Sequence, residues 1–364
     1  MAEATPKPRK GLRRAAVGIG LTAAGVGAAL VAERLAARRI RGRPDPESGE
    51  MFGRLPPDDL GTVRSFDGTE LAVRAAGPED APAVVFLHGV TLDLTTWYYQ
   101  WRSFSERYRC VLYDQRAHGR SGLPPEGDYS VNALGRDLEV VLDHAVPQGP
   151  AMLVGHSMGG MAILSLALER PEEFGNRVAG VVLADTGASD LLREVFGGLG
   201  TGVGEALRRL GNRLGRRMDT AERLQEWTRR FGTDLAFLIA RATNFGPHAS
   251  PSQIDYVSRL SRDAKPEVWV HALGELVQMD LRHALDHVRC PALVVVGDRD
   301  LMTPKTSGQA LRAALPDGRA VVITGAGHIS MMERHAAFNE VVGGFADEVL
   351  TGRKGRARKA AATP

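Results

Sequence analysis

The sequence predicts an α/β protein in which helices cover both faces of a mostly parallel β-sheet. Short, uninterrupted apolar runs such as 83–87 (AVVFL) recur along the chain, and segments with helical periodicity separate them. Strands that are apolar along their whole length are buried on both faces, which is typical of parallel sheets whose strands are connected by helices. The 364 residues, of which 43% are hydrophobic, are enough to bury a large core.

Seven strands are expected, over residues 70–76, 83–87, 110–113, 151–154, 178–183, 291–296 and 320–323. Helices are expected over 96–107, after an N-cap at Ser130, and from the end of the fourth strand to Glu169, two residues before a proline. Cys110 and Cys290 adjoin expected strands, which favours buried free thiols over a disulfide.

One region departs from this alternation. The stretch between Asp185 and Cys290 has helical spacing and no expected strand. A helical insertion between two strands of a parallel sheet lies over the carboxyl edge of the sheet, where ligands of α/β proteins bind. We therefore expect a cap at about 189–285, inserted before the strand that leads to the acidic residue considered below.

The charges are distributed unevenly along the chain. The net charge is +3, yet residues 1–43 carry ten Lys and Arg against two Glu, and residues 352–364 carry five cations and no acid. The remaining body is therefore acidic, with a net charge of −10. An acidic body offers no basic face for phosphates, which argues against a nucleic-acid partner. The basic ends are expected either to meet an anionic membrane surface or to be solvated and disordered.

The uncharged stretch 15–32 lies within the basic segment 1–43 and has cations on both sides. We favour an uncleaved membrane anchor, and an export signal and a disordered extension are the alternatives. The protein is thus expected to be membrane-associated, with exported or cytoplasmic locations left open. The Pro-, Gly- and Asp-rich residues 44–60 predict a linker. The globular domain is expected over 61–350, and 351–364 form a basic tail; the sequence does not indicate an oligomeric state.

A G-x-S-x-G motif occurs at Gly155–Gly159, with Ser157 at its centre. The motif follows the expected strand 151–154 directly and opens the next expected helix. A tight strand-to-helix turn of this kind exposes the serine hydroxyl to a substrate carbonyl, and its flanking positions must be small. Ser157 is therefore the candidate nucleophile.

A serine hydroxyl needs a base that takes its proton and an acid that orients the base. His328 is the only one of the ten histidines that follows the last expected strand in a loop of small residues, and it is the candidate base. Asp300, in the loop after the strand 291–296, is the preferred acid. Asp298 and Asp185 are the alternatives.

The attack of a serine on a carbonyl generates an oxyanion, which needs hydrogen-bond donors already in place. The backbone N–H of Met158 follows the nucleophile, and the backbone N–H of Val90 follows a turn that Gly89 permits. These two groups are the candidate oxyanion hole. Trp97 is a candidate for the wall of an acyl pocket, and packing of its ring against the sheet is the alternative.

From Gly61 to about Leu350 the chain resembles the serine α/β-hydrolases of the lipase, esterase and haloperoxidase-like kind. The resemblance rests on His88-Gly89, on the segment 114–121 (DQRAHGRS), on the serine motif and on the Asp300/His328 pair. One departure is Ala117, where the family more often has Gly. Asp114 and Arg116 are interpreted as a buried structural pair.

The resemblance implies hydrolysis of carboxylic esters, including lipophilic ones, through an acyl-enzyme on Ser157. A thioesterase, a lactonase, a cofactor-free perhydrolase and a non-catalytic binding protein with the hydrolase fold are the alternatives. The sequence has no CxxC, HExxH, GxxxxGK or GxGxxG motif, so we expect neither a metal nor a cofactor. The expected partner is a small ester or acyl compound.

Overall fold

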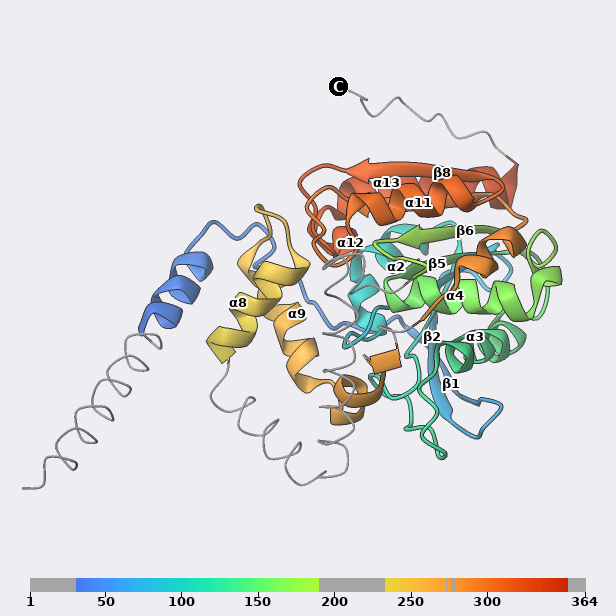
Figure 1. Ribbon diagram of the computed structural model, residues 1–364, viewed down its shortest axis with the longest axis horizontal. Coiled ribbons are helices and arrows are strands. Elements are labelled where there is room, and N and C mark those ends of the chain that lie inside the picture. The colour runs from blue at the N-terminus through green and yellow to red at the C-terminus, as the bar shows by residue number, and fades with distance from the viewer. Residues whose placement is uncertain (1–30, 190–232, 273, 276–278, 353–364) are drawn as a thin grey trace, which may run out of the picture.

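The computed structural model describes residues 31–189, 233–272, 274, 275 and 279–352 (Figure 1). Within them, one sheet has the strand order β1-β2-β4-β3-β5-β6-β7-β8. The strands are β1 (Asp58–Arg64), β2 (Glu70–Ala76), β3 (Ala83–Leu87), β4 (Arg109–Tyr113), β5 (Ala151–His156), β6 (Val178–Ala184), β7 (Ala292–Gly297) and β8 (Gly318–Ile323). The β1–β2 and β2–β4 pairs are antiparallel, and the pairs from β4 to β8 are parallel. The predicted α/β-hydrolase architecture, a mostly parallel sheet flanked by helices, is confirmed.

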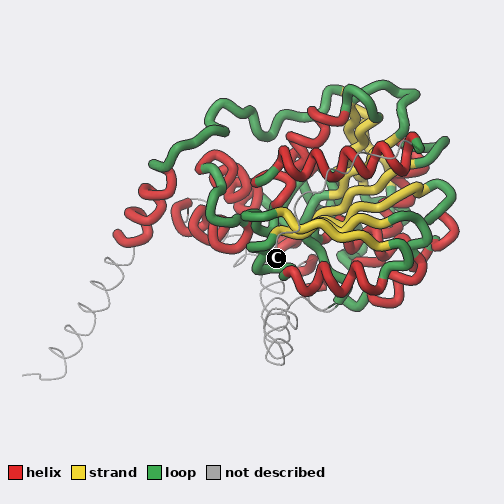
Figure 2. Tube along the Cα trace, turned by 90° about the horizontal axis from the view of Figure 1, so that it is seen from above, coloured by secondary structure: helices red, strands yellow, loops and turns green. Residues whose placement is uncertain are grey.

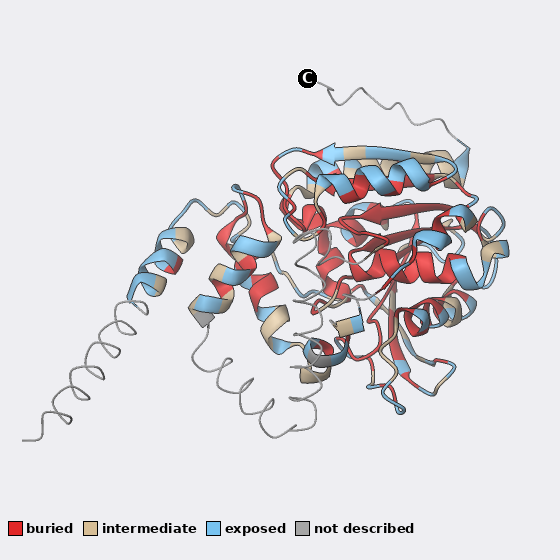
Figure 3. Ribbon diagram, in the orientation of Figure 1, coloured by how far each residue is buried: buried red, intermediate tan, exposed pale blue. Residues whose placement is uncertain are grey.

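Helices lie on both sides of the sheet (Figure 2). One face is covered by α3 (Val131–Ala145), α4 (Met158–Glu169) and α11 (Lys305–Ala314), and the other by α2 (Tyr98–Phe104) and α13 (His335–Thr351). Every residue of β3, β4, β5 and β7 is buried, as strands covered on both faces must be (Figure 3). The free thiols Cys110 and Cys290 are both buried, as predicted.

All seven expected strands are present, with ends that differ from the predicted ones by up to two residues. The eighth strand, β1, was not predicted. Its sequence DDLGTVR contains no apolar run, because it pairs with β2 alone at the edge of the sheet and its residues are mostly exposed or half-buried. An edge strand of this kind gives almost no periodic signal.

The helices begin and end close to the predicted residues. The hydroxyl of Ser130 accepts a hydrogen bond from the Ala133 N–H at 3.2 Å and caps α3, and α4 ends at Glu169. The helix expected over 96–107 is instead a 3₁₀ turn, η1 (Leu94–Trp97), followed by the shorter α2. Short helical elements complete the body: η2 (Pro171–Glu173) and α12 (Ser330–Glu333).

The described residues of the insertion between β6 and β7 form helices joined by loops and contain no strand. It contains α8 (Thr233–Asn244), α9 (Pro251–Asp263), the π-helical turn η4 (Val268–Ala272) and η5 (Arg282–His287). Helix α9 begins with a capping box between Ser250 and Gln253. The sequence S-P-S-Q carries that signal, since Ser, Pro and Gln are favoured at these positions of a helix N-terminus.

Residues 31–57, which we call the strap, run along the cap and the body. Composition predicts a linker over 44–60, but Asp45 accepts hydrogen bonds from the Ser252 N–H and hydroxyl at 3.1 and 2.6 Å, and Phe52 stacks on Tyr256 at 5.2 Å between ring centroids. Strand β1 also begins inside this range, at Asp58. Residues 44–57 form no helix or strand, and these isolated polar and aromatic contacts fasten them although the segment has no periodic pattern, so the linker stays a prediction.

The uncharged stretch 15–32 lies almost wholly outside the described residues, and so does the tail from residue 353. Within the described ranges, no helix has the length and apolar character needed to cross a membrane. Membrane association and the alternative locations therefore stay predictions.

Candidate active site

Ser157 occupies the turn between β5 and α4 with a strained backbone. Its φ is +50° and its ψ is −117°, a conformation that residues other than glycine rarely adopt. The turn requires small neighbours: a Cβ on Gly155 would lie 2.5 Å from the backbone of Gly159, and a Cβ on Gly159 would lie 2.3 Å from the Leu87 carbonyl oxygen. The motif thus exists because two backbone segments meet beside the serine.

The structure brings Ser157, His328 and Asp300 together. His328 Nε2 lies 3.1 Å from Ser157 Oγ, and His328 Nδ1 lies 2.9 Å from Asp300 Oδ2. All three residues are at most 5% exposed. A serine, an imidazole and a carboxylate in this order form the hydrogen-bonded arrangement that makes an alcohol nucleophilic.

The Asp300 carboxylate is held by several donors. Oδ1 accepts from the N–H groups of Met302 and Thr303 at 2.8 and 3.0 Å, and Oδ2 accepts from the Thr303 hydroxyl at 2.6 Å. Burial raises the pKa of Asp300, but the charge of His328 and these hydrogen bonds outweigh burial and lower it. Burial lowers the pKa of His328, and the charge of Asp300 overcomes this and raises it. The carboxylate therefore stays ionised and keeps the imidazole proton on Nδ1.

The two alternative acids have structural partners. Asp298 accepts a hydrogen bond from the Gly325 N–H at 2.6 Å. Asp185 accepts from the N–H groups of Gly297 and Ser330 at 2.8 and 3.1 Å, and burial together with the charge of Asp300 raises its pKa to about 7. Both side chains fix loops around the site, whereas Asp300 holds the imidazole.

The candidate oxyanion hole is formed where β3 and β5 end. A Cβ on Gly89 would lie 3.2 Å from Ser157 Cβ, so this backbone passes directly beside the nucleophile. His88 Nδ1–H donates to the Gly89 carbonyl oxygen at 2.8 Å. In a trans peptide the N–H points away from the C=O, so this bond directs the Val90 N–H away from His88. Met158 opens α4, where the N–H groups have no acceptor within the helix.

Three residues near the candidate triad were not predicted from the sequence. His156 Nε2–H donates to the His328 carbonyl oxygen at 2.7 Å and so connects the nucleophile turn to the base loop. Glu333 accepts from the Gly327 N–H at 2.7 Å and from the cap residue Gly246 at 2.8 Å. Thr303 donates to Asp300, as described above. Only proximity in sequence to the triad candidates could have suggested these residues, because no motif specifies these residue types and two of their contacts, from His156 to His328 and from Gly246 to Glu333, join distant parts of the chain.

Trp97 packs in the core. Its side chain is fully buried in the core, with ring centroids 5.1 Å from Phe86 and 6.2 Å from Phe338. These contacts favour the packing alternative, because the 3₁₀ turn η1 directs this ring onto the face of the sheet that α13 covers.

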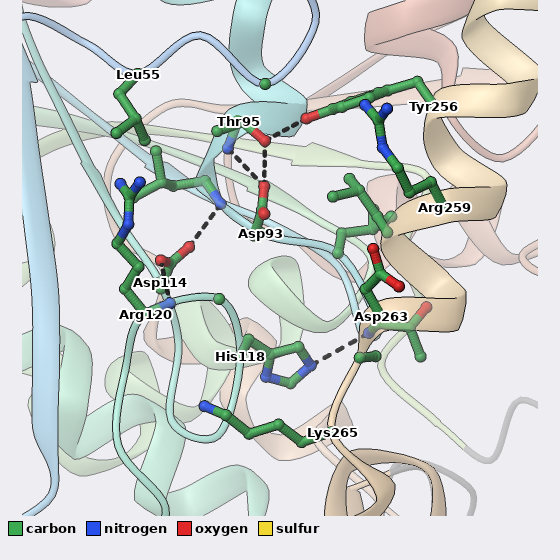
Figure 4. A pocket seen from close by; sticks show the side chains of 17 residues that line it. Leu55, Asp93, Thr95, Asp114, His118, Arg120, Tyr256, Arg259, Asp263 and Lys265 are labelled. Atoms are coloured by element: carbon green, nitrogen blue, oxygen red, sulfur yellow. Dashed lines mark hydrogen bonds between the residues drawn. The ribbon is translucent and has the colours of Figure 1, made fainter. Parts of the chain in front are cut away.

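Asp114 and Arg116 are both buried but do not pair with each other. Arg116 forms ion pairs with Asp137 at 2.7 Å and Asp67 at 3.0 Å. Asp114 accepts from the backbone N–H groups of Leu94 and Arg120, each at 2.8 Å (Figure 4). Burial and the charge of nearby Asp93 raise the pKa of Asp114 to about 7.

The same loop explains the departure at position 117. Ala117 has a φ of +65°, in the left-handed region that favours glycine. The more usual Gly would be relaxed there, and Ala tolerates the same backbone at some cost in strain.

Comparison with known sequences defines the class of this protein. The sequence model of the α/β-hydrolase fold family matches residues 82–335, which include both candidate oxyanion donors and the three triad candidates. The chain therefore belongs to the α/β-hydrolase fold family, whose members related to it are hydrolases acting on esters and similar bonds.

Individual proteins similar to this chain include lactonases and an esterase. The chain is 29% identical over 270 residues to 3-oxoadipate enol-lactonase 2 of Acinetobacter baylyi, covering 73% of this chain and 89% of that protein. It superimposes on a thermophilic esterase from Thermogutta terrifontis with a TM-score of 0.65 and 26% identity, covering 80% and 98% of the two chains. The enol-lactonase from Burkholderia xenovorans LB400 has the same fold, with a TM-score of 0.64, 24% identity and coverage of 79% and 100%.

No group of three or more His, Cys, Asp or Glu side chains in the described part of the chain has an arrangement that could hold a metal ion.

Proposed function

We propose that this protein hydrolyses carboxylic esters through an acyl-enzyme formed on Ser157. The observation that carries the proposal is the position of His328, whose two ring nitrogens lie 3.1 Å from Ser157 Oγ and 2.9 Å from Asp300 Oδ2. Membership of a hydrolase family and the strained turn at Ser157 support the same conclusion.

Acylation begins when Ser157 Oγ attacks the ester carbonyl carbon and His328 Nε2 takes the hydroxyl proton. The carbonyl oxygen becomes an oxyanion, which the N–H groups of Val90 and Met158 would stabilise. The tetrahedral intermediate then collapses: the bond to the leaving oxygen breaks, and His328 gives its proton to the departing alcohol. Asp300 stabilises the imidazolium that exists between these two proton transfers.

Deacylation repeats these steps with water as the nucleophile. His328 takes a proton from the water as its oxygen attacks the acyl carbon, and returns the proton to Ser157 Oγ as the carboxylic acid leaves. The substrate supplies the acyl group and water is the co-reactant, so the steps require only Ser157, His328, Asp300 and the two N–H groups.

A lactone is the second candidate substrate. The relative from Acinetobacter baylyi is an enol-lactonase, and the match covers 89% of its length. A lactone is an internal ester, so the same steps open its ring, with the alcohol remaining attached to the acyl group. The choice between open-chain esters and lactones depends on the shape of the pocket and not on the triad.

The test uses the full-length protein and a fluorophosphonate probe, which reacts with activated serines. We expect the wild type to be labelled and to hydrolyse p-nitrophenyl esters, and we expect Ser157→Ala to lose both properties. Ser103→Ala, at an exposed position of α2, is the matched control. Labelling that persists in Ser157→Ala, or a folded wild type that is neither labelled nor active, would contradict the proposal. A panel of esters and lactones of increasing acyl size then separates the two substrate classes.

A further inference from the structure

Thr91 has an unusual backbone conformation next to the candidate oxyanion donor. Its φ is +62°, and β-branched residues rarely adopt positive φ. Such a conformation persists only where surrounding contacts impose it. Two contacts do so here: the Thr91 N–H donates to His118 Nε2 at 3.2 Å, and Thr91 Oγ1 lies 3.3 Å from Ser261 Oγ of α9.

The His118 ring has a single orientation and tautomer. Nδ1–H donates to the Arg116 carbonyl oxygen at 2.9 Å, which leaves the lone pair of Nε2 facing Thr91. In Figure 4 the dashed line from His118 marks this bond, and the ring lies between the loop that carries Asp114 and Arg120 and the end of α9. Burial, together with the charges of His88 and Lys265, lowers the pKa of His118 to about 3. The ring is therefore neutral and accepts this hydrogen bond throughout the ordinary pH range.

The two peptide planes on either side of Val90 are fixed by different histidines. His88 holds the Gly89–Val90 peptide through its carbonyl oxygen, at 2.8 Å. His118 holds the Val90–Thr91 peptide through its N–H. The two rings lie 5.2 Å apart, and both are fully buried. The Val90 N–H belongs to the Gly89–Val90 peptide, and only φ and ψ of Val90 connect this plane to that of the Val90–Thr91 peptide. Holding the second plane therefore restricts the orientation of the first, and with it the direction of the Val90 N–H.

We propose that His118 is a positioning residue for the oxyanion hole, which sets the direction of the Val90 N–H by holding the strained peptide of Thr91. The inference rests on the proposed function. His118 does not touch the substrate. Its effect reaches the reaction through the Val90 N–H.

Two substitutions of His118 separate its two hydrogen bonds. In His118→Gln the side-chain oxygen takes the place of Nε2 and accepts from Thr91. In His118→Asn the side-chain amide takes the place of Nδ1, keeps the bond to Arg116 and leaves Thr91 without an acceptor. We expect His118→Asn to lower kcat about tenfold or more at a similar KM, because losing an oxyanion donor outright costs about 100–1000-fold. His118→Gln should recover most of this loss.

The affinity of a trifluoromethyl ketone gives the second readout. This compound forms a tetrahedral adduct with the serine and places an oxyanion in the hole, so its affinity should fall in His118→Asn by the same factor as kcat/KM. Melting temperatures of both variants and of the exposed control His144→Asn show whether each protein is folded.

The outcomes distinguish this inference from the proposed function. If the wild type hydrolyses esters and is labelled at Ser157 but folded His118→Asn keeps kcat within twofold, the positioning role is wrong and the proposed function stands. Equal losses of activity in folded His118→Asn and His118→Gln would also overturn it, because the acceptor at Nε2 would then not matter. An inactive, unlabelled wild type would instead defeat the proposed function.

Discussion

The nucleophile turn and the cap are held in place by different kinds of interaction. Ser157 lies between β5 and α4, whose residues are buried and hydrogen-bonded through the backbone. The cap helices α8 and α9 are fastened to the strap by partly exposed ion pairs of Arg41 with Asp234 at 2.6 Å and Asp255 at 3.2 Å, in addition to apolar packing such as that of Phe52 on Tyr256. The comparison predicts that loss of the polar strap contacts loosens α8 and α9 more than β5 and α4.

The interactions in the two regions contribute different amounts to the free energy of folding. Burial of apolar surface in the strands and α4 stabilises the fold by roughly 25 cal/mol per Å². An exposed ion pair contributes only about 0–1 kcal/mol, since water and salt screen it. The ion pairs between the strap and the cap are partly exposed, so each contributes little, and buried cap side chains such as Phe237 and Ile254 add apolar packing to the attachment.

The largest effect is expected for a substitution in the candidate triad. Asp300→Asn should lower kcat by about 1,000–10,000-fold, because the neutral amide no longer stabilises the imidazolium or holds its tautomer. Asp298→Asn is the matched control, because Asp298 bonds to the Gly325 N–H and not to the imidazole. Ester turnover of the two variants decides the assignment: a large loss in Asp298→Asn with little loss in Asp300→Asn would show that the acid has been misassigned.

The pH dependence of kcat/KM tests the assignment of Asp300 as the partner of His328. His328 must be neutral to accept the serine proton, and the charge of Asp300 raises its pKa. We therefore expect kcat/KM to fall as the pH decreases through a pKa above the ordinary value of about 6.5. The residual activity of Asp300→Asn should show this decline at a lower pH, because the neighbouring negative charge is gone. An unchanged or upward-shifted decline would contradict the electrostatic coupling of the pair.

The smallest expected effect tests the attachment of the cap. In the double variant Arg41→Ala/Asp45→Ala, amide hydrogen exchange should become faster in α8 and α9 and stay unchanged in β5 and α4. The variant removes strap contacts to both cap helices, and the melting temperature should change by a few degrees at most. Arg319→Ala, which breaks an exposed pair with Glu348 at 2.7 Å, is the control. Equal acceleration in both regions would refute the difference in attachment.

The sequence by itself predicted strands β2 to β8 and the residues of the candidate triad. Strands β2 to β8 are continuous apolar runs or close to them. The turn at Ser157 requires glycines at fixed positions. Both features can be predicted because they depend on residues that are neighbours in the sequence. His328 could be selected because it lies in a loop of small residues after the last strand. Edge strand β1 and the fastening of the strap carry no such local signal.

Tertiary structure alone decided which partners meet. Asp300, Asp298 and Asp185 all follow strands and look alike in sequence, and only the folded chain shows which carboxylate reaches the imidazole. The side chain of Trp97 could face a pocket or the core until the packing of α13 was known. The hydrogen bond between His118 and Thr91 likewise has no local signal, because the two residues lie in loops that follow different strands. Local patterns specify backbone conformation, whereas hydrogen bonds between residues far apart in the chain exist only after the sheet has brought the ends of its strands together.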